Sequence, residues 1–77
     1  MNPVNLNKII GKNIKKYRKI KKRNINELSK LTKIPISIIE SIENYTIERE
    51  ITIDELYKIS VVLDIPINKL LENKDDQ

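Results

Sequence analysis

The sequence contains no cysteine, histidine, tryptophan or phenylalanine, and it has a single glycine among 77 residues. Without cysteine there is no disulfide framework and no thiolate metal site, and without histidine the commonest general base and metal ligand are missing. One glycine cannot build a phosphate-binding loop, and no paired carboxylates fall in a catalytic motif. The sequence therefore predicts no enzyme, no cofactor and no metal site.

Long hydrophobic runs are also missing. No apolar stretch approaches the roughly 20 residues that a membrane-spanning helix needs. The polar segment from Met1 to Asn7 lacks the charged-then-apolar layout of a secretion signal. A length of 77 residues favours one small domain, 1–77, with a single core. We therefore expect a cytoplasmic protein with no membrane contact.

Positive charge is concentrated in one part of the chain. Residues 8–33 hold eleven Lys and Arg side chains against Glu27 alone, a net charge of +10, whereas residues 34–77 hold four basic and ten acidic side chains, a net charge of −6. Lys and Arg clusters release counterions when they contact phosphates, which supplies most non-specific nucleic-acid affinity. A solvated helix surface would give the same pattern, so on charge alone both interpretations stay open.

Apolar residues recur at helical spacing along the chain, and no strand-like alternation persists. Five helices are predicted, at about residues 6–22, 26–32, 36–43, 53–63 and 67–72, with a frayed tail at 73–77. Two N-terminal capping boxes support these starts, Asn24 with Glu27 and Thr52 with Glu55. Asn44 is the predicted terminator of the third helix, because asparagine tolerates left-handed backbone. The fold class is all-α.

The helical spacing also predicts which side chains face the interior. In the order of the first four helices they are Leu6, Ile10, Ile14 and Tyr17; Ile25, Leu28 and Leu31; Ile38, Ile39 and Ile42; and Ile53, Leu56, Ile59, Ser60 and Leu63. The fifth helix contributes Ile67, Leu70 and Leu71. On the third helix the residues left facing outward are Ile36, Ser37, Glu40 and Ser41.

Residues 24–32 and 35–43 predict two short helices joined by a turn of three or four residues, a helix-turn-helix candidate. The segments that carry a further likeness are Ile10-Gly11-Lys12, Tyr17-Arg18-Lys19, Glu27-Leu28-Ser29, Ile34, Ser37, Ile39, Ile42-Glu43-Asn44 and Val62-Leu63-Asp64-Ile65. With these residues at this spacing, about residues 9–72 resemble the phage-repressor family of helix-turn-helix domains, of the Cro/C1 or XRE type. Lys16-Tyr17-Arg18-Lys19, Ser60 to Leu63 and Leu70-Leu71 resemble in particular the amino-terminal DNA-binding domains of Sin-type repressors of biofilm and sporulation genes.

The resemblance implies a five-helix, lambda-repressor-like domain of a bacterial or phage protein associated with the nucleoid. Its second and third helices would dock on double-stranded DNA, as a homodimer on a two-fold operator. It also implies an internal ion pair between Arg18 and Glu43. The chain departs from the family at Lys33, where relatives usually have a left-handed glycine.

The candidate DNA-contacting residues fall into two groups. The predicted base-edge contacts are Ile36, Ser37, Glu40 and Ser41, and the predicted phosphate contacts are Arg23, Asn24, Asn26, Lys33, Asn44 and Arg49. Apolar groups contact the thymine methyl, whereas guanine is read mainly by Arg or Lys, which the outward set lacks. We therefore expect a sequence-selective transcriptional regulator, a repressor, that prefers AT-rich operators.

A second function fits the same fold. Ile36 is an apolar residue at a position where many relatives have a polar or basic one, and exposed apolar surface marks protein partners. The alternative is a protein-interaction module, an antirepressor, antitoxin or co-regulator, that uses the Ile36 surface.

Overall fold

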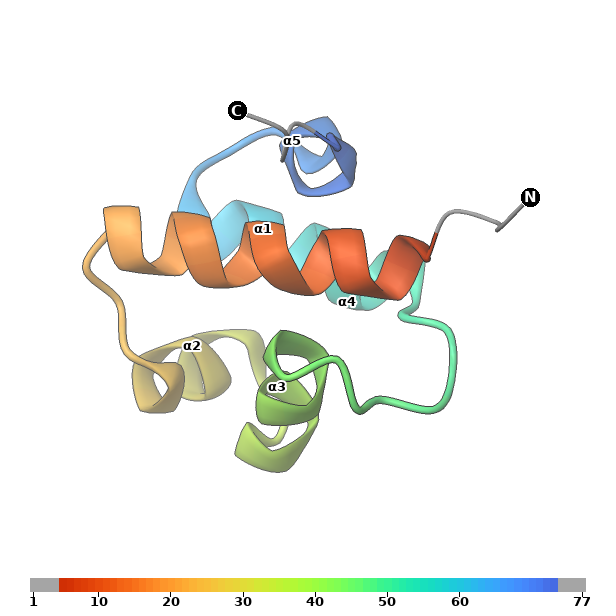
Figure 1. Ribbon diagram of the computed structural model, residues 1–77. Coiled ribbons are helices and arrows are strands. Elements are labelled where there is room, and N and C mark those ends of the chain that lie inside the picture. The colour runs from red at the N-terminus through yellow and green to blue at the C-terminus, as the bar shows by residue number, and fades with distance from the viewer. Residues whose placement is uncertain (1–4, 74–77) are drawn as a thin grey trace.

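The computed structural model describes residues 5–73, which fold into helices with no strand in that range. The helices are α1 (Leu6–Ile20), α2 (Ile25–Thr32), α3 (Ile36–Glu43), α4 (Ile53–Leu63) and α5 (Ile67–Leu71). Figure 1 shows α1 crossing the middle of the molecule, with α2 and α3 on one side of it, α5 on the other and α4 behind. The predicted all-α, five-helix fold is confirmed. Of the predicted tail, Asn73 lies in no helix and residues 74–77 lie outside the described range.

Both predicted capping boxes are present. The Asn24 side chain accepts from the Glu27 amide at 2.8 Å, and Glu27 Oε1 accepts from the Asn24 amide at 3.0 Å. Thr52 and Glu55 make the corresponding bonds at 3.1 and 2.9 Å. These bonds satisfy amides that the first turn of a helix leaves unpaired. Helix α4 begins at the predicted residue, Ile53, and α2 begins at Ile25, one residue earlier than predicted.

The helix ends differ more from the prediction. Four residues other than glycine adopt left-handed backbone, at Lys22, Lys33, Tyr45 and Asp64. Helix α1 ends at Ile20, two residues before the predicted end, and Lys22 with a φ of 59° lies in the connection to α2. Asn44 terminates α3 as predicted, but with a φ of −96°, and the left-handed conformation is adopted by the next residue, Tyr45, at 63°. Helix α5 ends at Leu71, one residue early.

The core is a cluster of aliphatic side chains to which all five helices contribute. Its fully buried members are Ile10, Ile14, Leu28, Ile39, Ile42, Ile59, Leu63 and Leu70. Four residues predicted to face inward are exposed instead: Leu6 and Leu31 are each 51% exposed, Ile53 is 72% exposed and Leu71 is 39% exposed. Each lies at the edge of its apolar stripe, and a domain of this size has too little interior to cover the whole width of five stripes.

Gly11 and Asn13 of α1 fix the positions of α3 and α5. A Cβ atom on Gly11 would collide with the carbonyl oxygen of Ile42, so only glycine permits this close approach of α1 and α3. Asn13 Nδ2 donates to the carbonyl oxygens of Leu70 and Glu72, at 2.8 Å each. The first bond reaches the last turn of α5, and the second reaches the residue that follows it.

Candidate nucleic-acid interface

The outward face of α3 carries the predicted base-edge residues. Ile36, Ser37 and Glu40 are exposed and Ser41 is half-buried, whereas Ile39 and Ile42 on the opposite side are fully buried. Because the helix repeats every 3.6 residues, positions 36, 37, 40 and 41 form one continuous surface. The structure therefore brings these four side chains together on the surface of a helix that α1 and α2 support.

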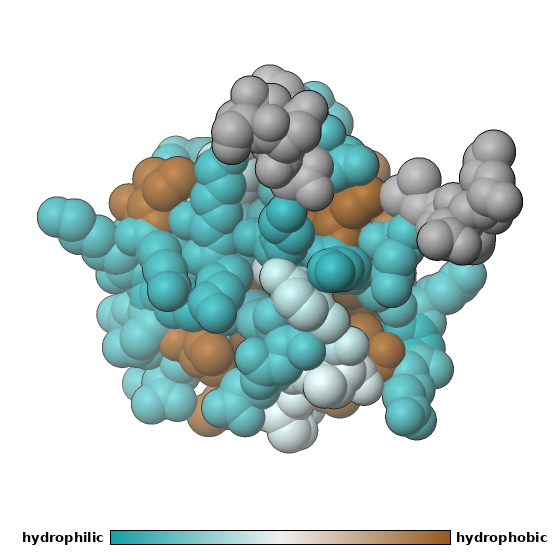
Figure 2. Space-filling view, in the orientation of Figure 1, coloured by the Kyte–Doolittle hydropathy of each residue, from teal (hydrophilic) through white to brown (hydrophobic). Residues whose placement is uncertain are grey.

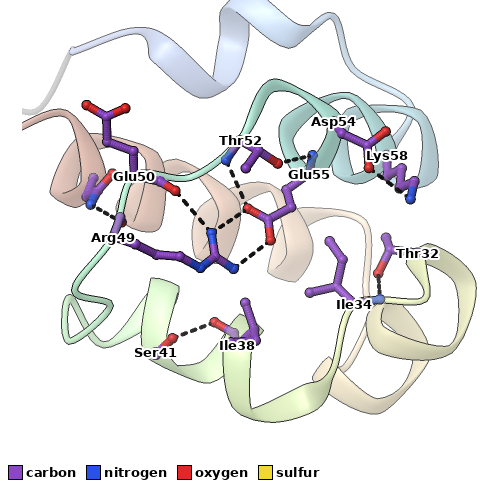
Figure 3. Close-up of polar contacts among 11 residues, drawn as sticks. Thr32, Ile34, Ile38, Ser41, Arg49, Glu50, Thr52, Asp54, Glu55 and Lys58 are labelled. Carbon is purple, nitrogen blue, oxygen red and sulfur yellow. Dashed lines mark hydrogen bonds and ion pairs between the residues drawn. The ribbon is translucent and has the colours of Figure 1, made fainter.

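The chemistry of this face is limited. Ile36 is 40% exposed and offers an aliphatic surface. The Ser41 hydroxyl donates to the carbonyl oxygen of Ile38 at 2.8 Å, as Figure 3 shows, so this proton is already engaged. Ser37 offers a donor and an acceptor, and the carboxylate of Glu40 accepts only. This face can contact a thymine methyl and make a few hydrogen bonds, but it has no cation for guanine.

The turn between α2 and α3 is held by hydroxyl groups whose role the sequence analysis missed. Ser29 Oγ donates to the carbonyl oxygen of Ile34 at 2.6 Å. Thr32 Oγ1 donates to the Leu28 carbonyl oxygen at 2.7 Å. It also accepts from the Ile34 amide at 3.2 Å (Figure 3). Ile34 itself is buried. Ser and Thr side chains often bond to nearby backbone in this way. The sequence signal for these bonds was the presence of Ser29 and Thr32 within the six residues before Pro35.

Four of the predicted phosphate contacts lie at the ends of α2 and α3. Asn26 in the first turn of α2, Lys33 in the turn and Asn44 at the end of α3 are exposed. Lys33 has the left-handed backbone that the resemblance implied for this position, with a φ of 66°. Asn24 is also exposed, but its side-chain oxygen caps α2.

Arg23 is only half-buried, and its backbone is fixed by Arg18. The Arg23 amide donates to the Arg18 carbonyl oxygen at 2.9 Å, and the Arg23 carbonyl oxygen accepts from Arg18 Nη1 at 2.9 Å. This segment connects α1 to α2. The start of α2, with Asn24 and Asn26, is therefore held against the end of α1.

Arg49 is engaged elsewhere. Its guanidinium bonds both carboxylate oxygens of Glu55, at 2.8 and 3.1 Å, and donates to the Glu50 carbonyl oxygen at 3.0 Å (Figure 3). The hydrogen bond with Arg49 lowers the pKa of Glu55, and the same bond raises the pKa of Arg49. Arg49 therefore pairs its charge with the N-terminal turn of α4. No sequence pattern predicts this pair, because two residues joined across a loop have no fixed spacing.

Arg18 and Glu43 form a bidentate ion pair beneath the helix-turn-helix. Arg18 Nε lies 2.7 Å from Glu43 Oε2, and Arg18 Nη2 lies 2.9 Å from Glu43 Oε1. The two side chains are 11% and 4% exposed. The hydrogen bond with Glu43 raises the pKa of Arg18. The pair implied by the resemblance is thus present, and it fixes the end of α3 to α1.

A family model described as a helix-turn-helix domain matches residues 11–76. This chain belongs to the helix-turn-helix domain family. Among curated proteins it is 37% identical over 68 residues to the HTH-type transcriptional regulator SinR of Bacillus licheniformis, and 35% identical over 68 residues to SinR of Bacillus subtilis strain 168. Each alignment covers 88% of this chain and 60% of the relative, so the chain spans well under the full length of these relatives.

Two solved structures resemble this helix-turn-helix domain. The structure titled SinR protein/SinI protein complex matches with a TM-score of 0.78 and 36% identity, covering 87% of this chain and 64% of that one. The solution structure of the N-terminal DNA-binding domain of the master biofilm regulator SinR from Bacillus subtilis matches with a TM-score of 0.69 and 34% identity. It covers 87% of this chain and 96% of that one. The predicted likeness to Sin-type amino-terminal domains is confirmed.

Two features are absent from the described residues of this helix-turn-helix domain. No helix there is long and apolar enough to cross a membrane. Residues 5–73 also hold no group of three or more His, Cys, Asp or Glu side chains arranged to bind a metal ion.

Proposed function

We propose that this chain is the DNA-binding domain of a transcriptional regulator, a repressor that inserts α3 into the major groove of an operator. The observation that carries the proposal is the outward face of α3, whose four predicted base-edge residues lie together on a rigidly supported helix. The similarity to SinR regulators, one of them solved as a DNA-binding domain, supports it. We assign the protein to the cytoplasm and to no enzymatic role.

The proposed operator is rich in A and T. Ile36 would contact thymine methyl groups, and Ser37 with Glu40 would add hydrogen bonds to base edges. Asn26, Lys33 and Asn44 would contact phosphates on either side of the groove and set the register. Arg49 is the weakest of the predicted phosphate contacts, because its guanidinium would have to leave Glu55 to make one.

We also propose that two copies bind a two-fold operator, with half-sites about one helical turn, or 34 to 36 Å, apart. An apolar hollow of about 450 Å³ supports self-association. The exposed side chains of Leu6, Ile53 and Leu71 border it, and the buried Ile51 and Leu56 form part of its lining. Sedimentation of the chain with and without an operator duplex tests this: a ratio of one protein per duplex at saturation would contradict it.

The DNA proposal is tested by a matched pair of variants at exposed apolar positions. Ile36→Asp places a negative charge on the outward face of α3, whereas Val61→Asp places the same charge on an exposed position of α4. In fluorescence anisotropy with duplexes selected from a random pool, we expect Ile36→Asp to weaken binding at least about tenfold, or about 1.4 kcal/mol. Val61→Asp should stay within about twofold of wild type. Equal titration curves for the two variants, or no preference of wild type for any duplex, would overturn the proposal.

The same variants test the alternative function. In it the chain is a protein-interaction module, an antirepressor, antitoxin or co-regulator, that binds its partner through the Ile36 surface. The SinR relative has been solved in a complex with SinI protein, which supports a protein partner for this fold. The alternative gains if wild type gives a flat DNA titration while a protein co-purifies with it and is lost in Ile36→Asp. A protein co-regulator in addition to DNA is compatible with the leading proposal.

A further inference from the structure

The outer face of α1 is a continuous surface of lysines, defined here as the α1 lysine face. Its members, Lys8, Lys12, Lys15, Lys16 and Lys19, are all exposed. They follow one another at steps of four, three, one and three residues, so they share one side of the helix. Helix α1 contains no acidic residue. The face extends along the axis for roughly 16 Å, at about 1.5 Å per residue.

This face is separate from the surface proposed to contact the operator. Helix α1 turns Gly11 and Arg18 toward α3, where they meet Ile42 and Glu43. At about 100° per residue, the centre of the lysine face lies about a quarter turn away from Gly11 and Arg18. The outward face of α3 is on the side of that helix opposite Ile42. A duplex bound to α3 therefore lies on the far side of α3 from α1, out of reach of most of the α1 lysines.

The view in Figure 2 shows the front of the molecule, where α1 crosses it in Figure 1, as a largely hydrophilic surface. Beside the lysine face, α1 and α5 enclose a hollow of about 290 Å³. Lys12, Lys16 and Lys69 line it together with one carboxylate, Glu72, which lies 3.7 Å from Lys69 Nζ. Lys16 Nζ also lies 5.2 Å from the centroid of the Tyr17 ring. The α1 lysine face is thus bordered by a hollow that three lysines line, which suits a polyanion.

A lipid surface fits this face poorly. An amphipathic helix binds a membrane by burying its apolar side among acyl chains. The apolar side of α1 is already used in the core, where Ile10 and Ile14 are no more than 1% exposed. A duplex fits better, because it presents one phosphate charge per about 1.7 Å of axis, or about nine charges along the length of the face. A protein already bound to one site also meets further segments of the same DNA at high effective concentration.

We propose that the α1 lysine face is a second, sequence-independent DNA-binding surface, which holds another duplex segment while α3 occupies the operator. The inference rests on the proposed function, since α3 carries the first duplex. It makes the domain a bridge between two DNA segments. Recognition on the second surface is by phosphate charge alone, so we expect it to be indifferent to base sequence and steeply dependent on salt.

The test uses two variants with equal charge loss. Lys15→Gln/Lys19→Gln removes two lysines of the face, and Lys30→Gln/Lys58→Gln removes two exposed lysines of α2 and α4. Wild type bound to an immobilised operator duplex is titrated with a second, labelled duplex of random sequence at several salt concentrations. We expect the face variant to bind the second duplex at least about fivefold more weakly and to lower the salt slope by nearly two, at about 0.9 per lost contact. The control variant should match wild type.

Each possible result decides the proposal. Binding of the first duplex is read separately, so failure there rejects the proposed function, whereas intact first binding without capture of a second duplex rejects only this inference. Equal capture by the two variants also rejects it, and points to bridging through the α3 faces of paired copies. If poly-glutamate of equal total charge displaces the second duplex as well as DNA does, the surface binds acidic polypeptides and the DNA assignment is wrong.

Discussion

Replacing Glu43 by alanine would leave the Arg18 guanidinium without its carboxylate in a site where the two side chains are only 11% and 4% exposed. Removing one partner of a buried pair costs about 3–5 kcal/mol, because the remaining charge is desolvated and uncompensated. A chain of 77 residues has a total stability of roughly 4–12 kcal/mol, at about 0.05–0.15 kcal/mol per residue. The variant should therefore lose a large fraction of its stability. At about 4–8 °C per kcal/mol, its Tm should fall by at least about 12 °C.

The assay is urea and thermal unfolding followed by circular dichroism at the helical band. Arg18 Nη1 still donates to the Arg23 carbonyl oxygen after the substitution, so the loss should lie toward the lower end of the range. Glu40→Ala is the matched control, because it removes an exposed carboxylate from the preceding turn of the same helix. It should change the free energy of unfolding by no more than about 0.5 kcal/mol. If Glu43→Ala falls within about 0.5 kcal/mol of Glu40→Ala, the ion pair does not stabilise the fold and the reasoning is wrong.

Three further perturbations test other parts of the structure. Gly11→Ala should destabilise the domain by about 1–3 kcal/mol, because the added methyl group meets the Ile42 carbonyl oxygen, and an unchanged urea midpoint would contradict this. Lys33→Gly should raise the free energy of unfolding by about 1 kcal/mol by relieving left-handed strain, and a lower urea midpoint would mean that the lysine makes compensating contacts. The pKa of Glu55 is lowered by Arg49, so the folded state binds this proton less readily than the unfolded state. Its contribution should be complete above the ordinary glutamate value of about 4.3 and lost as pH falls through the lowered value, and Glu55→Gln should flatten that acid limb of the urea midpoint.

Local signals in the sequence predicted most of the fold. The bounds of α3 and α4 are those predicted, because the apolar spacing agrees with Pro35 at the start of α3 and with the Thr52–Glu55 capping box at the start of α4. Helix ends were harder, since Lys22 and Tyr45 adopt left-handed backbone although neither residue type has an intrinsic preference for it. Periodicity also gives the direction of an apolar stripe but not its buried width. For that reason Leu6, Leu31, Ile53 and Leu71 were wrongly placed in the core.

The candidate site was likewise predicted only in part from the sequence. Helical spacing was enough to place Ile36, Ser37 and Glu40 on one outward face, because a helix turns at a known rate. It could not tell that the Ser41 hydroxyl bonds to the Ile38 carbonyl oxygen, or that Arg49 pairs with Glu55. These bonds depend on the rotamer of a side chain and on the path of a loop, and neither follows from spacing.

The side-chain amide of Asn13 has a consequence for the order in which the domain opens. Helix α5 has five residues, far fewer than the roughly 12 to 15 at which an isolated helix becomes even marginally stable in water. It therefore persists only while docked, held by the burial of Leu70 and by the two bonds that Asn13 makes across 57 and 59 positions of sequence. A segment of this kind unfolds locally at a lower free energy than the rest of the domain. The amide protons of α5 should exchange with solvent through an opening that leaves the helix-turn-helix folded, and removing the Asn13 amide would make that opening more frequent.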